Sequence, residues 1–185
     1  MTTLHDDIPH PIPPAAYLRY KENYFFILIA QDQGVYGIVH INHEPGFDRV
    51  KYTANLSVKG KTYLYNKVVS PFPKNWERAT EIGDGQLQCK FVKAHQQFDL
   101  SLHTDEIDWQ CTFTAAQPTF DYGACKTAGG LGGNRLSFQE VMTVGTMMQY
   151  EHQQQALLAS GKVTVAGGET IAFNGKGYRD HSWVF

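Results

Sequence analysis

Apolar and polar side chains alternate along much of this chain. Residues 50–58 place Val, Tyr, Ala, Leu and Val between lysine, threonine, asparagine and serine. The same period of two recurs at 98–102 and is most regular at 107–114, where Asp, Gln and Thr separate the apolar residues. A period of two is typical of a strand with one buried and one solvated face. These three segments therefore predict β-strands.

Further strands are predicted by short apolar runs that end at turn residues. The run 24–30 is apolar on both faces, so we expect it deep in a sheet and not at an edge. Gly-Asp-Gly at 83–85 and Gly-Gly at 167–168 are typical hairpin turns. The further predicted strands are 24–30, 35–41, 61–70, 76–82, 87–91, 162–166 and 169–173. About nine short strands with little helix predict an antiparallel barrel.

The alternation fails between residues 118 and 134, where the glycine-rich run 129–133 predicts a loop. This loop could be a lid at the mouth of the barrel or a plain connection. It lacks the glycine spacing of phosphate-binding loops. Ser137 and Glu140 have the spacing of a helix-capping box, but β-favouring residues follow, so we predict mostly strand over 142–158.

Composition narrows the range of partners. The 185 residues are enough for one domain or a tight pair, and a net charge of −2 gives no electrostatic case for nucleic acid or an anionic membrane. Aromatic residues make up 13% of the chain, which suggests a wide apolar interior. The longest apolar run, 24–30, is too short to span a bilayer.

The N-terminal part is predicted to be a lead-in to the barrel. Prolines make residues 1–22 extended, and the barrel domain is expected over 23–185. Residues 1–14 carry two aspartates and no Lys or Arg ahead of an apolar stretch, which does not fit a signal peptide. We therefore expect a cytoplasmic protein.

Cysteines and histidines outside the C-terminal run are interpreted as structural. The three cysteines have no C-x-x-C spacing, and Cys89 and Cys111 fall at apolar positions of predicted strands. His40 and His43 are three residues apart, which places their imidazoles on opposite faces of a strand. We therefore predict no metal site and no cofactor.

The candidate chemistry lies in the last eleven residues, 175–185. In a strand, Arg179, His181 and Trp183 project to one face, and Asp180 and Ser182 project to the other. Burial would raise the pKa of an aspartate, and a nearby arginine would lower it. The ordinary pKa of a histidine is close to neutral pH, so His181 needs little change in its pKa to transfer protons there. An alternative is that Arg179 packs over Trp183 and only closes one end of the barrel.

The segment Gly177 to Trp183 resembles the Arg-Asp-His-Ser-Trp motif of the hydroxyneurosporene synthase (carotenoid 1,2-hydratase) and AttH-like family. Residues 149–152, 161–165 and 168–169 resemble the strands that precede this motif. The resemblance implies an all-β fold, a lipocalin-like (calycin) antiparallel β-barrel that binds apolar molecules. Some family members hydrate terpenoid double bonds, and related fungal barrels act as Diels–Alder cyclases.

By this resemblance, the catalytic candidates are Asp180, His181 and Trp183. Asp180 or His181 would protonate an alkene, and Trp183 with a tyrosine would shelter the cation before water adds.

The candidate ligand contacts are Arg179, Tyr178, Tyr150 and Glu151. The implied ligand is an apolar small molecule such as a terpenoid, a polyketide or an acyl chain.

Two departures from the family pattern leave other interpretations open. Val184 follows the motif where the family usually has glycine, and family members continue into a second barrel. The chain could therefore be the first half of a two-barrel protein, paired with a second barrel or in a homodimer. It could also be a carrier that binds an apolar ligand without chemistry.

Overall fold

The computed structural model describes residues 7–12, 14–122 and 150–184. The strands of one antiparallel sheet dominate it, joined in part by the short 3₁₀ turns η2 (Pro14–Ala16), η3 (Gln31–Gln33) and η4 (Pro45–Phe47). The strands are β1 (Lys21–Ala30), β2 (Val35–Glu44), β3 (Arg49–Val58), β4 (Lys61–Val69), β5 (Glu81–Gly83), β6 (Leu87–Lys93), β7 (Gln97–His103), β8 (Ile107–Ala115), β9 (Phe120–Asp121), β10 (Tyr150–Val165) and β11 (Thr170–Val184).

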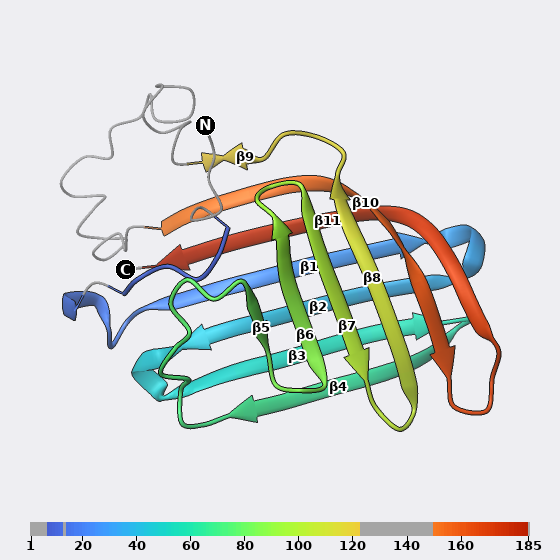
Figure 1. The fold of residues 1–185 in the computed structure, drawn as a ribbon, viewed down its shortest axis with the longest axis horizontal. Helices are drawn as coiled ribbons and strands as arrows, with labels where there is room; N and C mark the ends of the chain where they lie inside the picture. The colour runs from blue at the N-terminus through green and yellow to red at the C-terminus, as the bar shows by residue number, and fades with distance from the viewer. Residues whose placement is uncertain (1–6, 13, 123–149, 185) are drawn as a thin grey trace, which may run out of the picture.

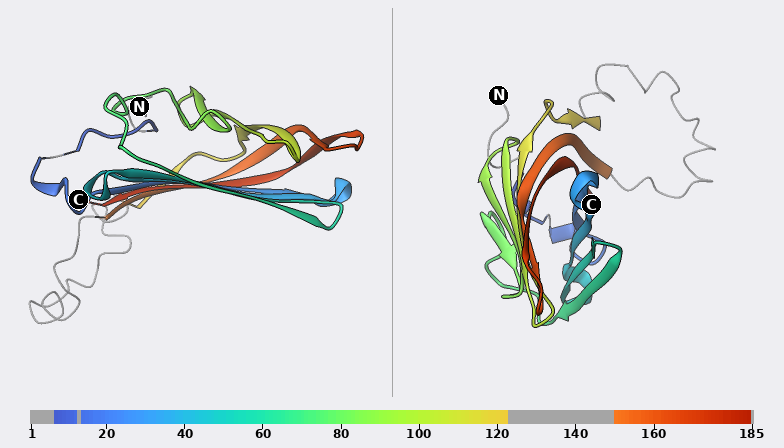
Figure 2. Two further views of the ribbon diagram at one scale, coloured as in Figure 1. Left: turned by 90° about the horizontal axis from the view of Figure 1, so that it is seen from below. Right: turned by 90° about the vertical axis from the view of Figure 1, so that its right-hand side faces the viewer.

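The sheet folds over on itself into a flattened half-barrel. Its strand order is β4-β3-β2-β1-β11-β10-β8-β7-β6-β5, and β9 pairs with β10. Strands β1 to β4 form one layer, and β5 to β8 cross above it (Figures 1 and 2). Strands β10 and β11 bend from one layer into the other (Figure 2). The predicted all-β, lipocalin-like antiparallel architecture is therefore confirmed.

Side chains link the two ends of the sheet, β4 and β5. The Tyr52 hydroxyl on β3 donates a hydrogen bond to the Gly83 carbonyl on β5 (3.0 Å). The Tyr65 hydroxyl on β4 donates to an Asp84 carboxylate oxygen directly after β5 (2.5 Å). These bonds hold the two layers together where the strand order has no ladder between β4 and β5.

Most of the predicted strands are confirmed. The first strand lies between β2 and β11, at the centre of the sheet as its two apolar faces predicted. The expectation of a strand from residue 76 is wrong, because β5 begins only at Glu81. Trp76 instead packs its indole against Phe72 and His43, with ring centroids 5.2 and 5.4 Å away.

The hairpin predicted near the C-terminus is longer than expected. Strands β10 and β11 pair continuously from Tyr150–Val184 to Thr164–Thr170, so residues 175–184 continue the strand that begins at Thr170. Residues 150–158 of the predicted strand 142–158 belong to β10. The glycine-rich run 129–133, the capping box and residues 142–149 lie outside the described residues.

The space between the layers is filled by aliphatic and aromatic side chains. Trp109, Phe98, Phe113 and Phe173 are among the largest of the fully buried side chains. Cys89 and Cys111 are buried free thiols among them, as predicted. In the described parts of the chain, no helix is long and apolar enough to cross a membrane.

Candidate functional site

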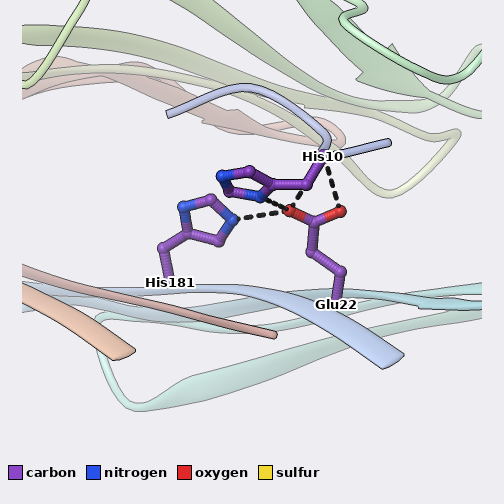
Figure 3. A group of neighbouring side chains, drawn as sticks. All are labelled: His10, Glu22 and His181. Atoms are coloured by element: carbon purple, nitrogen blue, oxygen red, sulfur yellow. Dashed lines mark hydrogen bonds and ion pairs between the residues drawn. The ribbon is translucent and has the colours of Figure 1, made fainter. Parts of the chain in front are cut away.

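The N-terminal segment 7–12 lies across one end of the half-barrel, close to the end of β11 (Figure 1). Asp7 and Ile8 are buried, and His10 is partly exposed. His10 reaches down to Glu22 at the start of β1, and β11 brings His181 to the same carboxylate (Figure 3). Residues distant in sequence therefore meet in one cluster, His10, Glu22 and His181, which we call the histidine–glutamate cluster.

One carboxylate oxygen holds both imidazoles. Nδ1 of His10 lies 2.6 Å from Oε1 of Glu22, and Nε2 of His181 lies 2.9 Å from the same oxygen. The other oxygen, Oε2, accepts the Tyr20 hydroxyl (3.1 Å) and the backbone N–H of His10 (3.2 Å). Both oxygens of a carboxylate that is 0% exposed are thus engaged.

Glu22 is ionised in this setting. Burial alone would raise its pKa, but the hydrogen bonds that it accepts from His10 and His181 outweigh burial and lower the pKa to about 2. An ionised carboxylate accepts hydrogen bonds and donates none. The nitrogens that face Glu22 therefore carry the protons, Nδ1 in His10 and Nε2 in His181.

The remaining ring nitrogens point away from Glu22 (Figure 3). Burial lowers the pKa of His181 despite its bond to Glu22, so its ring is neutral near pH 7. Its Nδ1 is buried and has no hydrogen-bond partner among the described residues. This nitrogen is a proton acceptor next to the apolar interior.

Aromatic rings surround the cluster. The indole of Trp183 stacks on His10 with ring centroids 4.1 Å apart and lies 4.8 Å from His181. The Tyr24 ring also stacks on His181, with ring centroids 4.5 Å apart. Trp183 is only partly buried. Together with partly exposed His10, it is where the cluster meets the surface.

His43 lies in the same end of the core, with its ring edge-on to those of Tyr24, Phe72 and Trp76. Burial lowers the pKa of His43 from 6.5 to about 4. As predicted, His40 points to the other face, where its Nε2 contacts Asn23 (3.1 Å). A shared metal site for His40 and His43 is therefore not formed.

The low pKa of His43 predicts acid sensitivity. Between its unfolded pKa of 6.5 and its folded pKa of about 4, the unfolded chain takes up a proton that the folded chain does not, so stability falls as the pH falls. The loss by about pH 4 is on the order of 3 kcal/mol. We expect His43→Phe to keep the ring contacts and make this slope shallower in urea unfolding at about pH 7 and about pH 4.5. An unchanged slope would show that His43 is not responsible.

A second buried cluster anchors the N-terminal segment. Nη1 of Arg179 lies 2.7 Å from a carboxylate oxygen of Asp7, and its Nε donates to the Gln155 side-chain oxygen (3.0 Å). Asp7 also accepts the backbone N–H of His95. Arg179 and Asp7 are 1% and 0% exposed. The ion pair fixes residue 7 only three residues before His10.

Arg179 and Trp183 do not stack on each other. The Arg179 guanidinium lies 4.5 Å from the centre of the Phe98 ring, and Trp183 stacks on His10. The alternative prediction, in which Arg179 packs over Trp183 to close one end of the barrel, is therefore wrong.

The predicted alternation of faces along β11 is observed. Arg179 and His181 are buried in the interior with partly buried Trp183, and Asp180 bonds on the opposite face to His152 and Gln154. Asp180 and His181 therefore serve different faces of the sheet. Ser182 lies on the Asp180 side, 3.5 Å from the Asn23 amide.

The candidate ligand contacts divide between the two faces. Glu151 pairs with Trp183 across the β10–β11 ladder and shares its face, as Gln155 does with Arg179. Tyr178 lies on the Asp180 side. Tyr150 pairs with Val184, and its side chain lies outside the described part of the chain. The interior therefore gathers Arg179, His181, Trp183 and Glu151.

Sequence analysis missed His10, Glu22 and Asp7, which it placed in the lead-in. Glu22 did carry a signal, because it continues the inward alternation of Tyr24, Phe26 and Leu28 on β1. An acidic residue at an inward position of a central strand indicates a buried charge with a partner. The contact of His10 has no comparable signal.

Comparison with known families covers nearly the whole chain. Residues 3–184 match the model of a family described as a domain of unknown function, DUF7064. The chain belongs to this family. Among curated proteins, no sequence relative of this DUF7064 chain is found.

Solved structures share the fold of this DUF7064 protein. A protein provisionally named AttH (NE1406) from Nitrosomonas europaea superposes with a TM-score of 0.65 at 14% identity, over 97% of this chain and 54% of its own. Kievitone hydratase from Nectria haematococca gives 0.54 at 13%, over 100% and 55%. CghA, solved with Sch210972, gives 0.52 at 11%, over 90% and 46%. The chain spans about half the length of these neighbours.

Proposed function

We propose that this protein binds an apolar small molecule beside Trp183 and adds water to, or removes it from, a carbon–carbon double bond. The observation that carries this proposal is one buried carboxylate bonded to two imidazoles next to a partly exposed indole. The hydratase named among the structural neighbours has the same fold, which makes the reaction class compatible with this architecture. The resemblance of residues 177–183 to the hydratase motif agrees with it.

Hydration needs an acid and a base, and the histidine–glutamate cluster holds one of each. Partly exposed His10, when protonated, gives the proton on its Nε2 to one carbon of the double bond. Water adds to the other carbon and passes its extra proton to Nδ1 of neutral His181. Ionised Glu22 stabilises the positive charge on each imidazole in turn through its hydrogen bonds to His10 and His181. His181 then releases the proton on its Nδ1 to solvent, and partly exposed His10 takes up a proton from solvent at Nε2. One alkene and one water thus become one alcohol, and the protein regains its starting protonation.

Trp183 has a binding role in this scheme. Its indole offers apolar area at the surface and an electron-rich face toward positive charge that develops on the ligand. Asp180, on the opposite face with His152, takes no part in the interior reaction. The proposed catalytic residues are therefore His10, Glu22 and His181, and Trp183 is a ligand contact.

The site is proposed at the mouth because the interior is packed. A hollow of about 720 Å³ does lie elsewhere, over β6, β7, β8 and β10. Its lining includes Lys90, Asp99, Gln110 and Lys162 but not His10, Glu22, His181 or Trp183, so it lies apart from the proposed acid and base.

Three other predictions stay open. Pairing with a second barrel, or a homodimer, is supported by exposed apolar side chains on the outer face, Ile29, Ile38 and Leu64. A cytoplasmic location and the division at residue 23 also remain predictions. Contacts of Asp7 and His10 with the interior favour treating the described part of the N-terminal segment as part of the barrel.

The test uses apolar alkenes in water labelled with heavy oxygen. Terpenoids, prenylated phenols and unsaturated acyl chains are incubated with the protein, and mass spectrometry detects the gain of one labelled water. We expect His181→Gln to reduce turnover by about 10²–10⁴, the usual contribution of an acid or base. His103, an exposed histidine paired with Asp108, provides the matched control His103→Gln, which should retain full turnover.

If the wild type binds an alkene and releases it unchanged, the proposed reaction is contradicted and the protein is a carrier. Tryptophan fluorescence measures ligand binding separately from turnover.

A further inference from the structure

We propose that His10, Glu22 and His181 also bind a divalent transition metal ion, zinc most readily, and that bound metal stops proton transfer by the two histidines. The binding half of this inference stands on the geometry of the cluster alone. The inhibitory half rests on the proposed function, because the metal would occupy the two imidazoles that transfer protons in that reaction.

The donor set is one that zinc prefers. Two imidazoles and one carboxylate form the protein ligands of many zinc sites that keep a fourth position open. One ligand atom from each of the three residues lies within 4.8 Å of the others. No other group of three such side chains is that close within the part of the chain that the structure describes.

Small movements would fit the ion. Zinc lies about 2.0–2.1 Å from its nitrogen ligands, so tetrahedral ligand atoms are about 3.3 Å apart. The nitrogen–oxygen distances to Oε1 are now 2.6 Å for His10 and 2.9 Å for His181. Each imidazole thus needs to move away from the carboxylate by less than about 1 Å.

The carboxylate is already oriented for a metal. Its Oε2 is held by the Tyr20 hydroxyl and the backbone N–H of His10, which leaves Oε1 facing both imidazoles. Such outer partners orient a ligand and strengthen metal binding. Partly exposed His10, with a side-chain exposure of 19%, gives the ion a route of entry.

The surroundings contain an unused polar atom. Nδ1 of His181 is buried and has no hydrogen-bond partner among the described residues. The Tyr24 ring stacks on that of His181. Unsatisfied buried polar atoms often mark a site for water or an ion. The nearest interior cation, Arg179, is paired with Asp7.

Metal binding and proton transfer exclude each other at these atoms. A metal ion would bind Nδ1 of His10 and Nε2 of His181, the nitrogens whose protons now face Glu22. In the neutral rings each proton would move to the other nitrogen. Metal-bound His10 could then not carry the second proton that it gives to the alkene, and His181 Nδ1 would no longer accept one from water.

The test titrates zinc into metal-free protein in competition with a chromophoric chelator, with no substrate present. We expect one equivalent of zinc to bind. His10→Ala and His181→Gln should each weaken zinc affinity by more than about 100-fold, because the loss of a direct ligand costs more than the loss of a residue that only orients a ligand. Tyr20→Phe should weaken it by about 10-fold. His103→Ala is the matched control and should leave affinity unchanged, while circular dichroism confirms that each variant is folded.

Saturable binding that is equally tight in His10→Ala and His181→Gln, or no saturable binding, would overturn the metal site. Cobalt gives an independent readout, because four-coordinate cobalt absorbs strongly in the visible range and His10→Ala should lose that spectrum. Zinc that binds but leaves water addition unaffected would overturn the inhibitory half alone. A protein that binds zinc and adds water to no alkene would contradict the proposed function and leave the metal site standing.

Discussion

Arg179→Met is expected to lower the free energy of unfolding by about 3–5 kcal/mol, because it leaves Asp7 as a buried charge without its partner. Arg179 is 1% exposed, and its guanidinium is also held by Gln155 and the face of Phe98. Methionine preserves much of the side-chain volume, so loss of the charge dominates. Urea unfolding of wild type and variant measures the effect.

Asp7→Asn in the Arg179→Met background separates the ion pair from packing. If the cost comes from the uncompensated carboxylate, the double variant should be more stable than the sum of the two single changes predicts. Strict additivity would show that residue 7 and Arg179 do not stabilise each other. The same variants should also release the N-terminal segment and so lower turnover.

Glu22→Gln is expected to reduce water addition by about 10²–10⁴, the range for loss of proton-transfer assistance. Glutamine has the size of glutamate, but its amide presents N–H groups where two imidazoles now donate to one oxygen. Apolar ligand affinity should change little, because the change removes no apolar area. Turnover and ligand titration by tryptophan fluorescence are measured on the same preparation.

Tyr20→Phe is the matched control for Glu22→Gln. It removes only the hydroxyl bonded to Oε2 and leaves both imidazole contacts with Oε1 in place. We expect a loss of less than about 10-fold in turnover. An equal loss in both variants would mean that the carboxylate acts only as a structural anchor and not by stabilising the charged imidazoles.

Alternation was sufficient to predict most strands and the two faces of β11. Because successive side chains of a strand point to opposite faces, the separation of Asp180 from His181 follows from the sequence alone. The same geometry explains why Arg179 does not stack on Trp183 to close the barrel. Arg179 and Trp183 share a face but are four residues apart, about 13 Å along a strand, which is too far for direct stacking.

The partners in the candidate site could not be predicted in the same way. Glu22 and His181 are separated by 159 positions and meet only because β1 pairs with β11 in one register. His10 reaches Glu22 from a proline-rich segment whose path no periodicity determines. Local pattern predicts which way a side chain points, and only the tertiary pairing determines what it meets.

NMR of the imidazole nitrogens tests most directly whether Glu22 holds His10 and His181 in the protonation states that the proposed acid and base need. At neutral pH in metal-free protein, Nδ1 of His10 and Nε2 of His181 should both carry protons, and Nδ1 of His181 should carry none. Glu22→Gln should shift the resonances of both rings together. Protons on the opposite nitrogens, or rings that do not respond to Glu22→Gln, would contradict these roles of His10, Glu22 and His181.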